Sequence, residues 1–297
     1  MKIIITGMPY FAKKIYKFLS DYDKSNTYLY LNTFYSYLDK IKYLINILSS
    51  DVIYIIGGTV NNSKVIDIAL LLNKKIIMHW AGSDVLYAKK NIQDNKFNYK
   101  YIKNIVHLCE VNWIQEELKN IGIKAKVSPI MICENEYKED YLLPKKFIVL
   151  SYIGKDRPKF YGIDTIYQLA IDFPDIEFRI AGLEYYKDAP KNIKFLGWTN
   201  MNEEYKKCVV YIRTPKHDGL AYSVLEALSY GRIVLRNYKF PNTIFFSNYN
   251  DLKNKLYKLI MEFEKDNLNI NTEGIKYVRD NYNKTKVLNS LIKIFES

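Results

Sequence analysis

Residues 217–231 read HDGLAYSVLEALSYG, and this stretch decides the fold to be expected of the chain. The apolar run Val209–Arg213 precedes it and has the character of a buried strand. Gly219 falls in the loop that follows, Ser223 is placed to cap a helix, and Gly231 ends that helix. Such a loop aims backbone N–H groups and the positive end of a helix at one point, which suits a diphosphate.

Two carboxylates stand out in this stretch. Asp218 lies on the loop, and Glu226 follows eight positions later in the first turn of the helix. Carboxylates placed in this way can reach different hydroxyls of one bound ligand. The structural alternative is that Glu226 complements the helix dipole and Asp218 caps a turn.

The same alternation of strand and helix runs along the whole chain. The expected strands are Lys2–Thr6, Thr27–Leu31, Asp51–Ile56, Lys75–His79, Ala125–Val127, Phe147–Ile153, Glu177–Ala181, Ile193–Leu196, Val209–Arg213 and Ile233–Leu235. Helical patterns separate most of them, which predicts parallel, doubly wound α/β sheets with right-handed crossovers. The segment Asp140–Lys146, with Pro144 inside it, is the predicted linker, so we expect one domain over 1–143 and a second over 144–280.

Composition bounds the class of protein. The chain has 297 residues, of which 48% are hydrophobic and 26% charged, as expected for a soluble protein with two cores. It has no apolar run of about 18 residues and no secretory signal, so the cytoplasm is the expected compartment. Three cysteines stand far apart without a C-x-x-C pair, which predicts buried free thiols rather than a zinc or redox site.

The formal net charge of +12 suits anionic partners such as nucleotide phosphates or lipid head groups. The excess is spread over both halves, and no nucleic-acid motif accompanies it, so we do not expect a nucleic-acid partner. Two basic stretches favour a peripheral contact with the inner membrane surface, although a solvated basic face explains them equally well. They consist of Lys13, Lys14 and Lys17 after Phe11, and of Lys89, Lys90, Lys96, Lys100 and Lys103 interleaved with Phe97, Tyr99 and Tyr101.

The stretch around Asp218 resembles the signature of the retaining GT-B glycosyltransferases of family 4, an acidic residue, seven residues, and then Glu. The match consists of Asp218-Gly219, Leu225-Glu226-Ala227 and Gly231. Further similar stretches, in the same order as in that family, are Val111–Leu118 with Gly122-Ile123, Ser151–Asp164, Phe178–Gly182, Phe195–Trp198 and Tyr277–Phe295. The resemblance implies two Rossmann-like domains that face each other across a cleft. It also implies an acceptor-side first domain, a donor-side second domain, and a last helix, 281–297, that packs back on the first.

The resemblance assigns roles to individual residues. Glu226 would bind the nucleotide ribose, and Asp218, one methylene shorter than the usual Glu, would contact the donor sugar as a catalytic residue. Two cations would neutralise the departing diphosphate, drawn from Lys155, Arg157 and Lys159 on what is otherwise a solvated basic loop. The donor would also contact the loop and helix start formed by Gly219, Leu220, Ala221, Tyr222 and Ser223.

Two positions in the first domain complete the expected site. His79 ends a strand and would line the cleft near the donor sugar as a second catalytic residue, although a histidine after an apolar strand is also often structural. Gly7 would allow donor or acceptor to approach closely, unless it serves only as a turn glycine.

The expected activity is therefore a hexosyl transfer from a UDP- or GDP-linked sugar to a glycan, lipid-linked or protein acceptor, with retention, with no cofactor and no metal. A nucleotide-sugar epimerase of the same fold and a degenerate, non-catalytic binding protein remain open alternatives. A metal-dependent transferase would need a D-x-D motif, and Asp21-Tyr22-Asp23 fits it in letters only.

Overall fold

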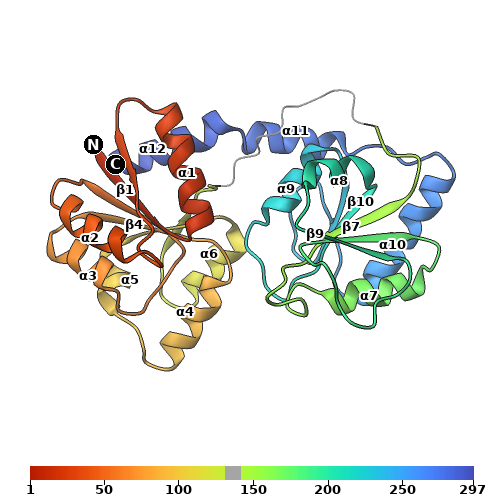
Figure 1. The fold of residues 1–297 in the computed structure, drawn as a ribbon, viewed down its shortest axis with the longest axis horizontal. Coiled ribbons are helices and arrows are strands. Elements are labelled where there is room, and N and C mark those ends of the chain that lie inside the picture. The colour runs from red at the N-terminus through yellow and green to blue at the C-terminus, as the bar shows by residue number, and fades with distance from the viewer. Residues whose placement is uncertain (131–141) are drawn as a thin grey trace. The chain divides into compact units, whose positions relative to one another are not determined.

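We describe the protein from a computed structural model that covers residues 1–130 and 142–297. The chain divides into two compact units, one of Met1–Ile132 with Lys284–Ser297 and one of Cys133–Asn283. The border between them falls within 131–141, which lies outside the described residues, as do Asp140 and Tyr141 of the expected linker. Each unit is built around its own six-stranded sheet (Figure 1).

The sheet of the first unit is parallel throughout, in the order β2-β1-β3-β4-β5-β6. Its strands are β1 (Lys2–Gly7), β2 (Thr27–Tyr30), β3 (Val52–Ile56), β4 (Lys75–Trp80), β5 (Val106–Cys109) and β6 (Ala125–Val127). The central strands read as continuous β-branched and apolar runs because both of their faces are covered by helices. All five residues of β3 are buried, for example.

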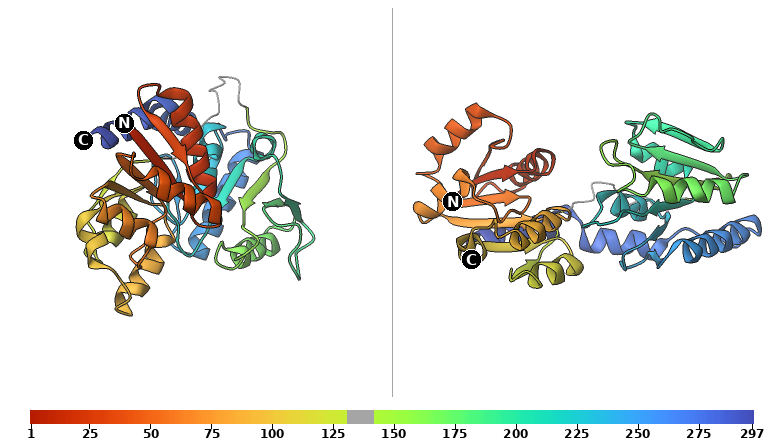
Figure 2. Two further views of the ribbon diagram at one scale, coloured as in Figure 1. Left: turned by 60° about the vertical axis from the view of Figure 1, so that its left-hand side comes forward. Right: turned by 90° about the horizontal axis from the view of Figure 1, so that it is seen from below.

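Helices cover both faces of this sheet (Figures 1 and 2). They are α1 (Pro9–Tyr22), α2 (Tyr37–Asn46), α3 (Lys64–Leu71), α4 (Asp84–Gln93), α5 (Tyr99–Asn104), α6 (Asn112–Lys119) and α12 (Lys284–Glu296). The core on one face joins α1 and α12 to alternate residues of the strands, such as Ile3, Ile5 and Tyr54. Right-handed crossovers then place α2 and α3 on the opposite face.

The last helix belongs to the first unit by its packing. Leu288, Leu291 and Phe295 of α12 are buried in the same core as Ile3 and Tyr54. Lys75 Nζ donates to the carbonyls of Ile294 and Phe295 at 2.8 and 2.9 Å, and so stabilises the negative end of the helix. The expected last helix, 281–297, starts three residues later than predicted, because α11 ends at Asn281 and α12 starts at Lys284.

The sheet of the second unit is also parallel, in the order β12-β11-β10-β7-β8-β9. Its strands are β7 (Ile148–Tyr152), β8 (Glu177–Ala181), β9 (Ile193–Gly197), β10 (Val210–Arg213), β11 (Ile233–Arg236) and β12 (Ile244–Phe245). Its helices are α7 (Ile163–Asp172), α8 (Met201–Lys207), α9 (Tyr222–Ser229), α10 (Tyr249–Glu264) and α11 (Thr272–Asn281). One core joins α7 and α10 to the sheet, so α8 and α9 take the other face.

The predicted fold class, parallel doubly wound α/β, is confirmed, and some elements are new. The sequence analysis did not predict β5, which is buried although His107 interrupts its apolar pattern. It also did not predict β12 or the long amphipathic helix α10. Cys109 and Cys208 are free and buried, while Cys133 lies outside the described residues.

Candidate functional site

Each sheet has a point at which the order of its strands reverses. In the first unit this point lies between β1 and β3, and in the second between β7 and β10. Parallel α/β sheets bind ligands there, outside the carboxyl ends of the strands, because the loops on either side turn in opposite directions and leave a crevice. Each unit has a pocket at this edge of its sheet.

The pocket of the second unit has a volume of about 1010 Å³. It follows the carboxyl ends of three neighbouring strands, with Tyr152 and Gly154 at the end of β7, Gly182 after β8 and Trp198 after β9. The remaining wall comes from two loops and consists of Lys155, Asp156, Arg157, Pro158, Tyr161, Leu183, Glu184, Tyr185 and Tyr186. This volume is ample for a nucleotide.

The pocket combines cations with exposed aromatic rings. Lys155 and Arg157 line it, whereas Lys159, the third expected cation, does not. The Arg157 guanidinium lies 4.6 Å from the centre of the Phe160 ring, which holds it over the loop by a cation–π contact. Trp198 is 85% exposed and Tyr185 74% exposed, so both rings present free faces to a ligand.

A close contact joins the loop after β7, part of which lines this pocket, to the loop after β10. Gly162, the N-cap of α7, has φ +89°, and a Cβ added there would meet Thr214 Oγ1 at 1.9 Å. Glycine is therefore required where the loop after β7 crosses the end of β10. The Lys216 N–H donates to the Phe160 carbonyl at 2.8 Å and joins the same two loops.

Asp218 is held beside this pocket by a buried arginine. Arg213, the last residue of β10, donates from Nε to Asp218 Oδ2 at 2.9 Å and from Nη2 to Oδ1 at 3.1 Å. Its Nη1 donates to the Tyr152 carbonyl at 3.3 Å, and the guanidinium lies 5.3 Å from the centre of the Tyr161 ring. Tyr152 and Tyr161 line the pocket, so Asp218 is connected to the pocket wall through one side chain.

This pairing raises the pKa of Arg213 despite the opposing effect of burial, because Asp218 attracts and hydrogen-bonds the cation. Arg236, the last residue of β11 and fully buried, adds a second positive charge 3.9 Å from Asp218 Oδ2. Asp218 is thus a buried carboxylate that lies between two arginines.

Glu226 lies on α9 and is partly exposed. The Tyr205 hydroxyl donates its one proton to Glu226 Oε2 at 3.0 Å, with the Ser223 carbonyl oxygen as a second acceptor at 3.2 Å. Burial, together with the Glu226 charge, raises the pKa of Tyr205 well above its ordinary value, so the tyrosine stays a donor. This bond fixes the orientation of the carboxylate.

The expected cap of this helix is wrong. α9 begins at Tyr222 with Ala221 as its N-cap, and no side chain caps it. Ser223 instead lies inside the first turn and its hydroxyl accepts a hydrogen bond from Tyr211 at 2.6 Å. The preceding loop residues Gly219, Leu220 and Ala221 are buried.

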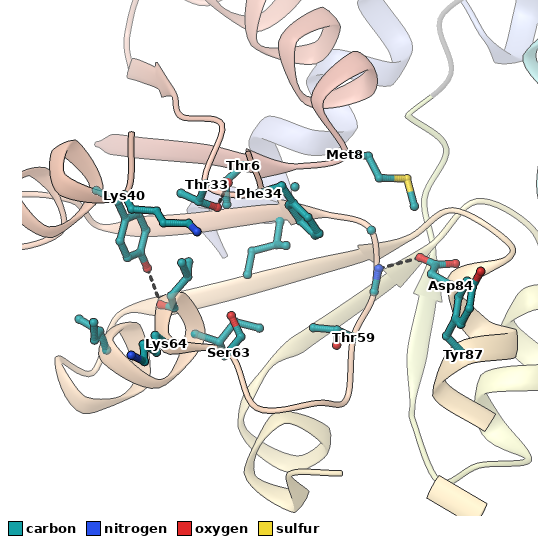
Figure 3. A pocket seen from close by; sticks show the side chains of 18 of the residues that line it. Thr6, Met8, Thr33, Phe34, Lys40, Thr59, Ser63, Lys64, Asp84 and Tyr87 are labelled. Atoms are coloured by element: carbon teal, nitrogen blue, oxygen red, sulfur yellow. Dashed lines mark hydrogen bonds between the residues drawn. The ribbon is translucent and has the colours of Figure 1, made fainter. Parts of the chain in front are cut away.

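The pocket of the first unit has a volume of about 650 Å³ and is lined mainly by apolar groups (Figure 3). Gly7 and Met8 at the end of β1, and Gly57 to Thr59 at the end of β3, form its inner edge. Helices α2 and α3 form one side, where the Tyr43 hydroxyl donates to the Val65 carbonyl at 2.7 Å. Figure 3 shows Lys40 and Lys64 as the lysines on this side.

Gly7 is needed for reasons internal to the sheet. It has φ +113°, and a Cβ there would meet the Ile56 carbonyl oxygen at 2.0 Å. The approach of β3 alone requires a glycine here, and a role of Gly7 in admitting a ligand stays a prediction. Asp84 organises the opposite wall, since its carboxylate accepts from the N–H groups of Gly58, Ala81 and Gly82 at 2.6, 3.0 and 2.8 Å.

His79 does not line either pocket, although its carbonyl accepts from the N–H of the lining residue Gly57 at 2.8 Å. It is fully buried, its Nδ1 is hydrogen-bonded to the Tyr54 hydroxyl at 2.9 Å, and its Nε2 lies 3.9 Å from Glu110 Oε1. Burial lowers the pKa of His79 to about 3, so the ring is neutral at physiological pH. The residue lines neither pocket, and its expected catalytic role stays a prediction.

Asp21-Tyr22-Asp23, which matches the D-x-D pattern, does not form a group of metal ligands among the described residues. Asp23 ends α1, and its carboxylate accepts hydrogen bonds from Ser25, Asn26 and Tyr28. Within residues 1–130 and 142–297, no three acidic, cysteine or histidine side chains are grouped as metal ligands would be. No helix in these ranges has the length and apolar character needed to cross a bilayer.

Comparison with known proteins now gives the fold a name. No family model and no curated protein matches the sequence. The structure of Anabaena HepE in complex with UDP and glucose superposes with a TM-score of 0.74 over 100% of this chain and 99% of the other, at 12% identity. Sucrose-phosphate synthase from Thermosynechococcus elongatus gives 0.70 over 100% and 98%, at 10% identity. The fold is GT-B.

A third similar structure belongs to a different class of enzyme. UDP-GlcNAc 2-epimerase from Neisseria meningitidis, solved with UDP-GlcNAc, gives a TM-score of 0.54 over 99% of both chains, at 13% identity. At these identities the GT-B likeness shows the fold, and the chemistry must be argued from the site.

Several residues of the site escaped the sequence analysis. Arg213 was treated as the end of a strand, although an arginine closing an apolar strand five positions before an acidic residue is a signal for a buried ion pair. Tyr185 and Trp198 follow strand ends and were not singled out. The chain has 28 tyrosines, and nothing in the sequence distinguishes Tyr205 from the others.

Proposed function

We propose that this protein is a glycosyltransferase that moves a hexosyl group from a UDP- or GDP-linked donor to an acceptor hydroxyl, with retention and without a metal. The pocket of the second unit carries the proposal. It joins two cations, Lys155 and Arg157, to two exposed aromatic rings, Tyr185 and Trp198, at the carboxyl ends of parallel strands. A ligand with a flat base at one end and phosphates at the other matches this combination.

In this proposal the base of the donor stacks on Trp198 or Tyr185, and its phosphates meet Lys155 and Arg157. The bond that breaks joins the anomeric carbon to a phosphate oxygen, and negative charge develops on the diphosphate as it leaves. Cations already fixed at that position stabilise this charge without reorganisation. Glu226, held by Tyr205, would accept from ribose hydroxyls, and Asp218 would contact the sugar.

The arginines around Asp218 refine its proposed role. Both of its oxygens already accept from Arg213, so it would contact the sugar only through remaining lone pairs. A buried arginine pair also gives this edge of the sheet a positive field toward which the diphosphate is attracted. The acceptor, whether glycan, lipid-linked or protein, would enter the pocket of the first unit, whose walls are mainly apolar.

Calorimetry and donor turnover test this function together. UDP and GDP are titrated first, and the better ligand identifies the donor series. Release of nucleoside diphosphate from each donor is then followed with and without EDTA, and the anomer formed is assigned by NMR. We expect a nucleoside diphosphate to bind, turnover to survive EDTA and the anomeric configuration to be retained. Absence of binding to both nucleotides would sink the proposal.

An epimerase is the second candidate, favoured by the likeness to UDP-GlcNAc 2-epimerase. The NMR experiment separates the two, because an epimerase returns an intact nucleotide sugar with altered ring stereochemistry, whereas a transferase releases the nucleoside diphosphate. A degenerate binding protein would bind the nucleotide and leave the donor unchanged.

A further inference from the structure

Helix α2 presents an apolar face to solvent. Its buried residue is Tyr43, and Ile47, which follows the helix one turn later, is also buried. The opposite side of the helix and its flanks carry large apolar side chains that are 42–80% exposed. They are Phe34, Tyr35, Tyr37, Leu38, Ile41, Leu44, Ile45 and Leu48, and we call them the α2 face.

This pattern is the reverse of an ordinary surface helix, whose outer side is polar. Single exposed apolar residues need no explanation, but a contiguous set on one helix marks an interaction site. The helix itself is firmly held. Ser36 caps it by accepting from the Asp39 N–H at 3.1 Å, the Asp39 carboxylate accepts from the Asn32 N–H at 2.9 Å, and Tyr43 is anchored to α3. The α2 face is therefore a fixed surface and not a frayed segment.

Lysines border the α2 face. Lys40 and Lys42 lie on its two edges and are exposed. Lys40 also lines the pocket of the first unit, and Lys42 Nζ lies 3.8 Å from Asp39 Oδ1. Lys2 Nζ donates to Asn46 at 2.9 Å, and Lys74 Nζ to the Leu48 carbonyl at 2.9 Å, which places two more ammonium groups at the end of the helix. Aromatic rings gather at its beginning, at Phe34, Tyr35 and Tyr37.

We propose that the α2 face is a docking surface for an anionic lipid bilayer, into which helix α2 inserts parallel to the membrane plane. Interfacial helices combine an apolar face with lysines at its border, whose stems reach along the apolar surface while their charges meet lipid phosphates. Aromatic side chains favour the same head-group depth.

A second copy of this chain fits the α2 face less well. In a symmetric dimer the same patch meets itself, so the lysines at its edges would oppose their own copies. The cores of protein interfaces are also depleted in lysine. The bilayer places the same cations against negative charge.

The structure puts this surface away from the stretches that the sequence suggested. On α1, Phe11 packs against the core, and Lys14 lies 5.7 Å from the centre of the Phe18 ring. In the second stretch Tyr101 is fully buried and Lys89 pairs with Glu117 at 2.7 Å. Exposed apolar side chains adjoin these basic residues only at Tyr10, Tyr87, Phe97 and Tyr99 among the described residues, fewer than on α2.

Vesicle flotation with the whole chain tests the proposal. The wild type should float with phosphatidylcholine vesicles that contain phosphatidylglycerol, and only weakly with phosphatidylcholine alone. Leu38→Gln/Ile41→Gln/Ile45→Gln should lower the bound fraction at least about tenfold, because the insertion depends on apolar area. The matched control is Leu71→Gln/Ile171→Gln/Tyr257→Gln, which removes three exposed apolar side chains elsewhere and should float like the wild type.

A second measurement reports insertion itself. In Ile41→Trp, brominated lipids should quench the new tryptophan, and its emission should shift to the blue when vesicles are added. The proposal is overturned if the wild type does not float with anionic vesicles, or if the triple variant at 38, 41 and 45 floats as well as its control. It is also overturned if light scattering shows a dimer that this variant abolishes while vesicle binding is unaffected.

Discussion

Arg213 grips Asp218 with two parallel hydrogen bonds, one to each carboxylate oxygen, at the end of strand β10. Both side chains are close to fully buried, at 8% and 11% exposed. A bidentate pair of this kind is geometrically specific. Removing one partner strongly destabilises the fold, because the other is left as a buried charge without a counterion or water.

Asp218→Asn should therefore lower the free energy of unfolding by about 3 kcal/mol or more, the usual cost of removing one member of a buried pair. Urea denaturation of the variant and the wild type measures the difference. Asp175→Asn, at an exposed aspartate of the same unit, serves as the control and should change stability by less than about 0.5 kcal/mol. Equal effects at the two positions would show that the ion pair contributes nothing.

The same substitution separates a structural from a catalytic role. Under conditions where Asp218→Asn is folded, donor turnover should fall while nucleoside diphosphate affinity stays within about twofold, as for an interaction realised in the transition state. Asp218→Glu keeps the charge opposite Arg213 and should retain more turnover than the amide. If the amide variant turns over the donor at the wild-type rate, Asp218 only positions the loop.

Glu226→Gln should weaken the binding of the nucleoside diphosphate by about 1.5–3 kcal/mol, about tenfold or more, because a charged acceptor of the ribose hydroxyls is lost. Calorimetry measures the change. Tyr205→Phe should have a smaller effect in the same direction, since it frees the carboxylate that the tyrosine orients. The control is Glu262→Gln on α10, an exposed position that should leave affinity unchanged.

Substitutions in the pocket of the second unit should show which residues bind the base of the nucleotide and which bind its phosphates. Trp198→Ala should weaken uridine and UDP alike, by about 1–3 kcal/mol if the base stacks on it. Arg157→Ala should weaken UDP and leave uridine unchanged. Lys159→Ala is the matched control, because Lys159 does not line the pocket, and its UDP affinity should stay near that of the wild type. For a GDP-specific protein, the same comparison uses guanosine and GDP.

The burial of His79 should make the free energy of unfolding depend on pH in the acid range. Burial lowers its pKa from 6.5 to about 3, so between these values the unfolded chain binds a proton that the folded chain does not. Stability must then fall as the pH falls through this window. His79→Asn keeps a hydrogen-bonding group for Tyr54 and removes the titration. Its stability deficit should shrink by about 2 kcal/mol between pH 6.5 and 5. A constant deficit would contradict the assignment of a neutral, buried ring.

The spacing of apolar residues, and the glycines and prolines that end helices and strands, were enough to predict much of the fold. The run Lys2–Thr6 forms a strand whose two faces are both buried, and its β-branched residues suit that position. Glu177–Ala181 alternates instead, with Phe178 and Ile180 buried and Glu177 and Arg179 only partly buried. β5 was missed because His107 reads as polar. In the structure its Nδ1 accepts from Trp80 at 3.2 Å and its Nε2 lies 3.0 Å from the Tyr101 carbonyl oxygen. These partners lie on other elements, so the residue pattern around His107 does not predict them.

The site was predicted less completely for the same reason. Asp218 and Glu226 were found by spacing, but the arginine and the tyrosine that hold them come from β10 and α8. The amphipathic pattern of α2 was visible in the sequence, but not which side faces the sheet, because apolar residues occupy both sides. Only packing shows that Tyr43 points inward and Ile41 outward.

The return of α12 to the first unit has a consequence for the order of folding on the ribosome. Strands β1 to β6 are synthesised early, yet part of their core is contributed by Leu288, Leu291 and Phe295. The second unit has its own core and emerges before α12, so it can reach its native state while the first unit still exposes an apolar strip. In a nascent chain arrested before Lys284, the first unit, although synthesised first, would therefore still bind chaperones through its exposed apolar strip. The second unit, synthesised later, would already be folded.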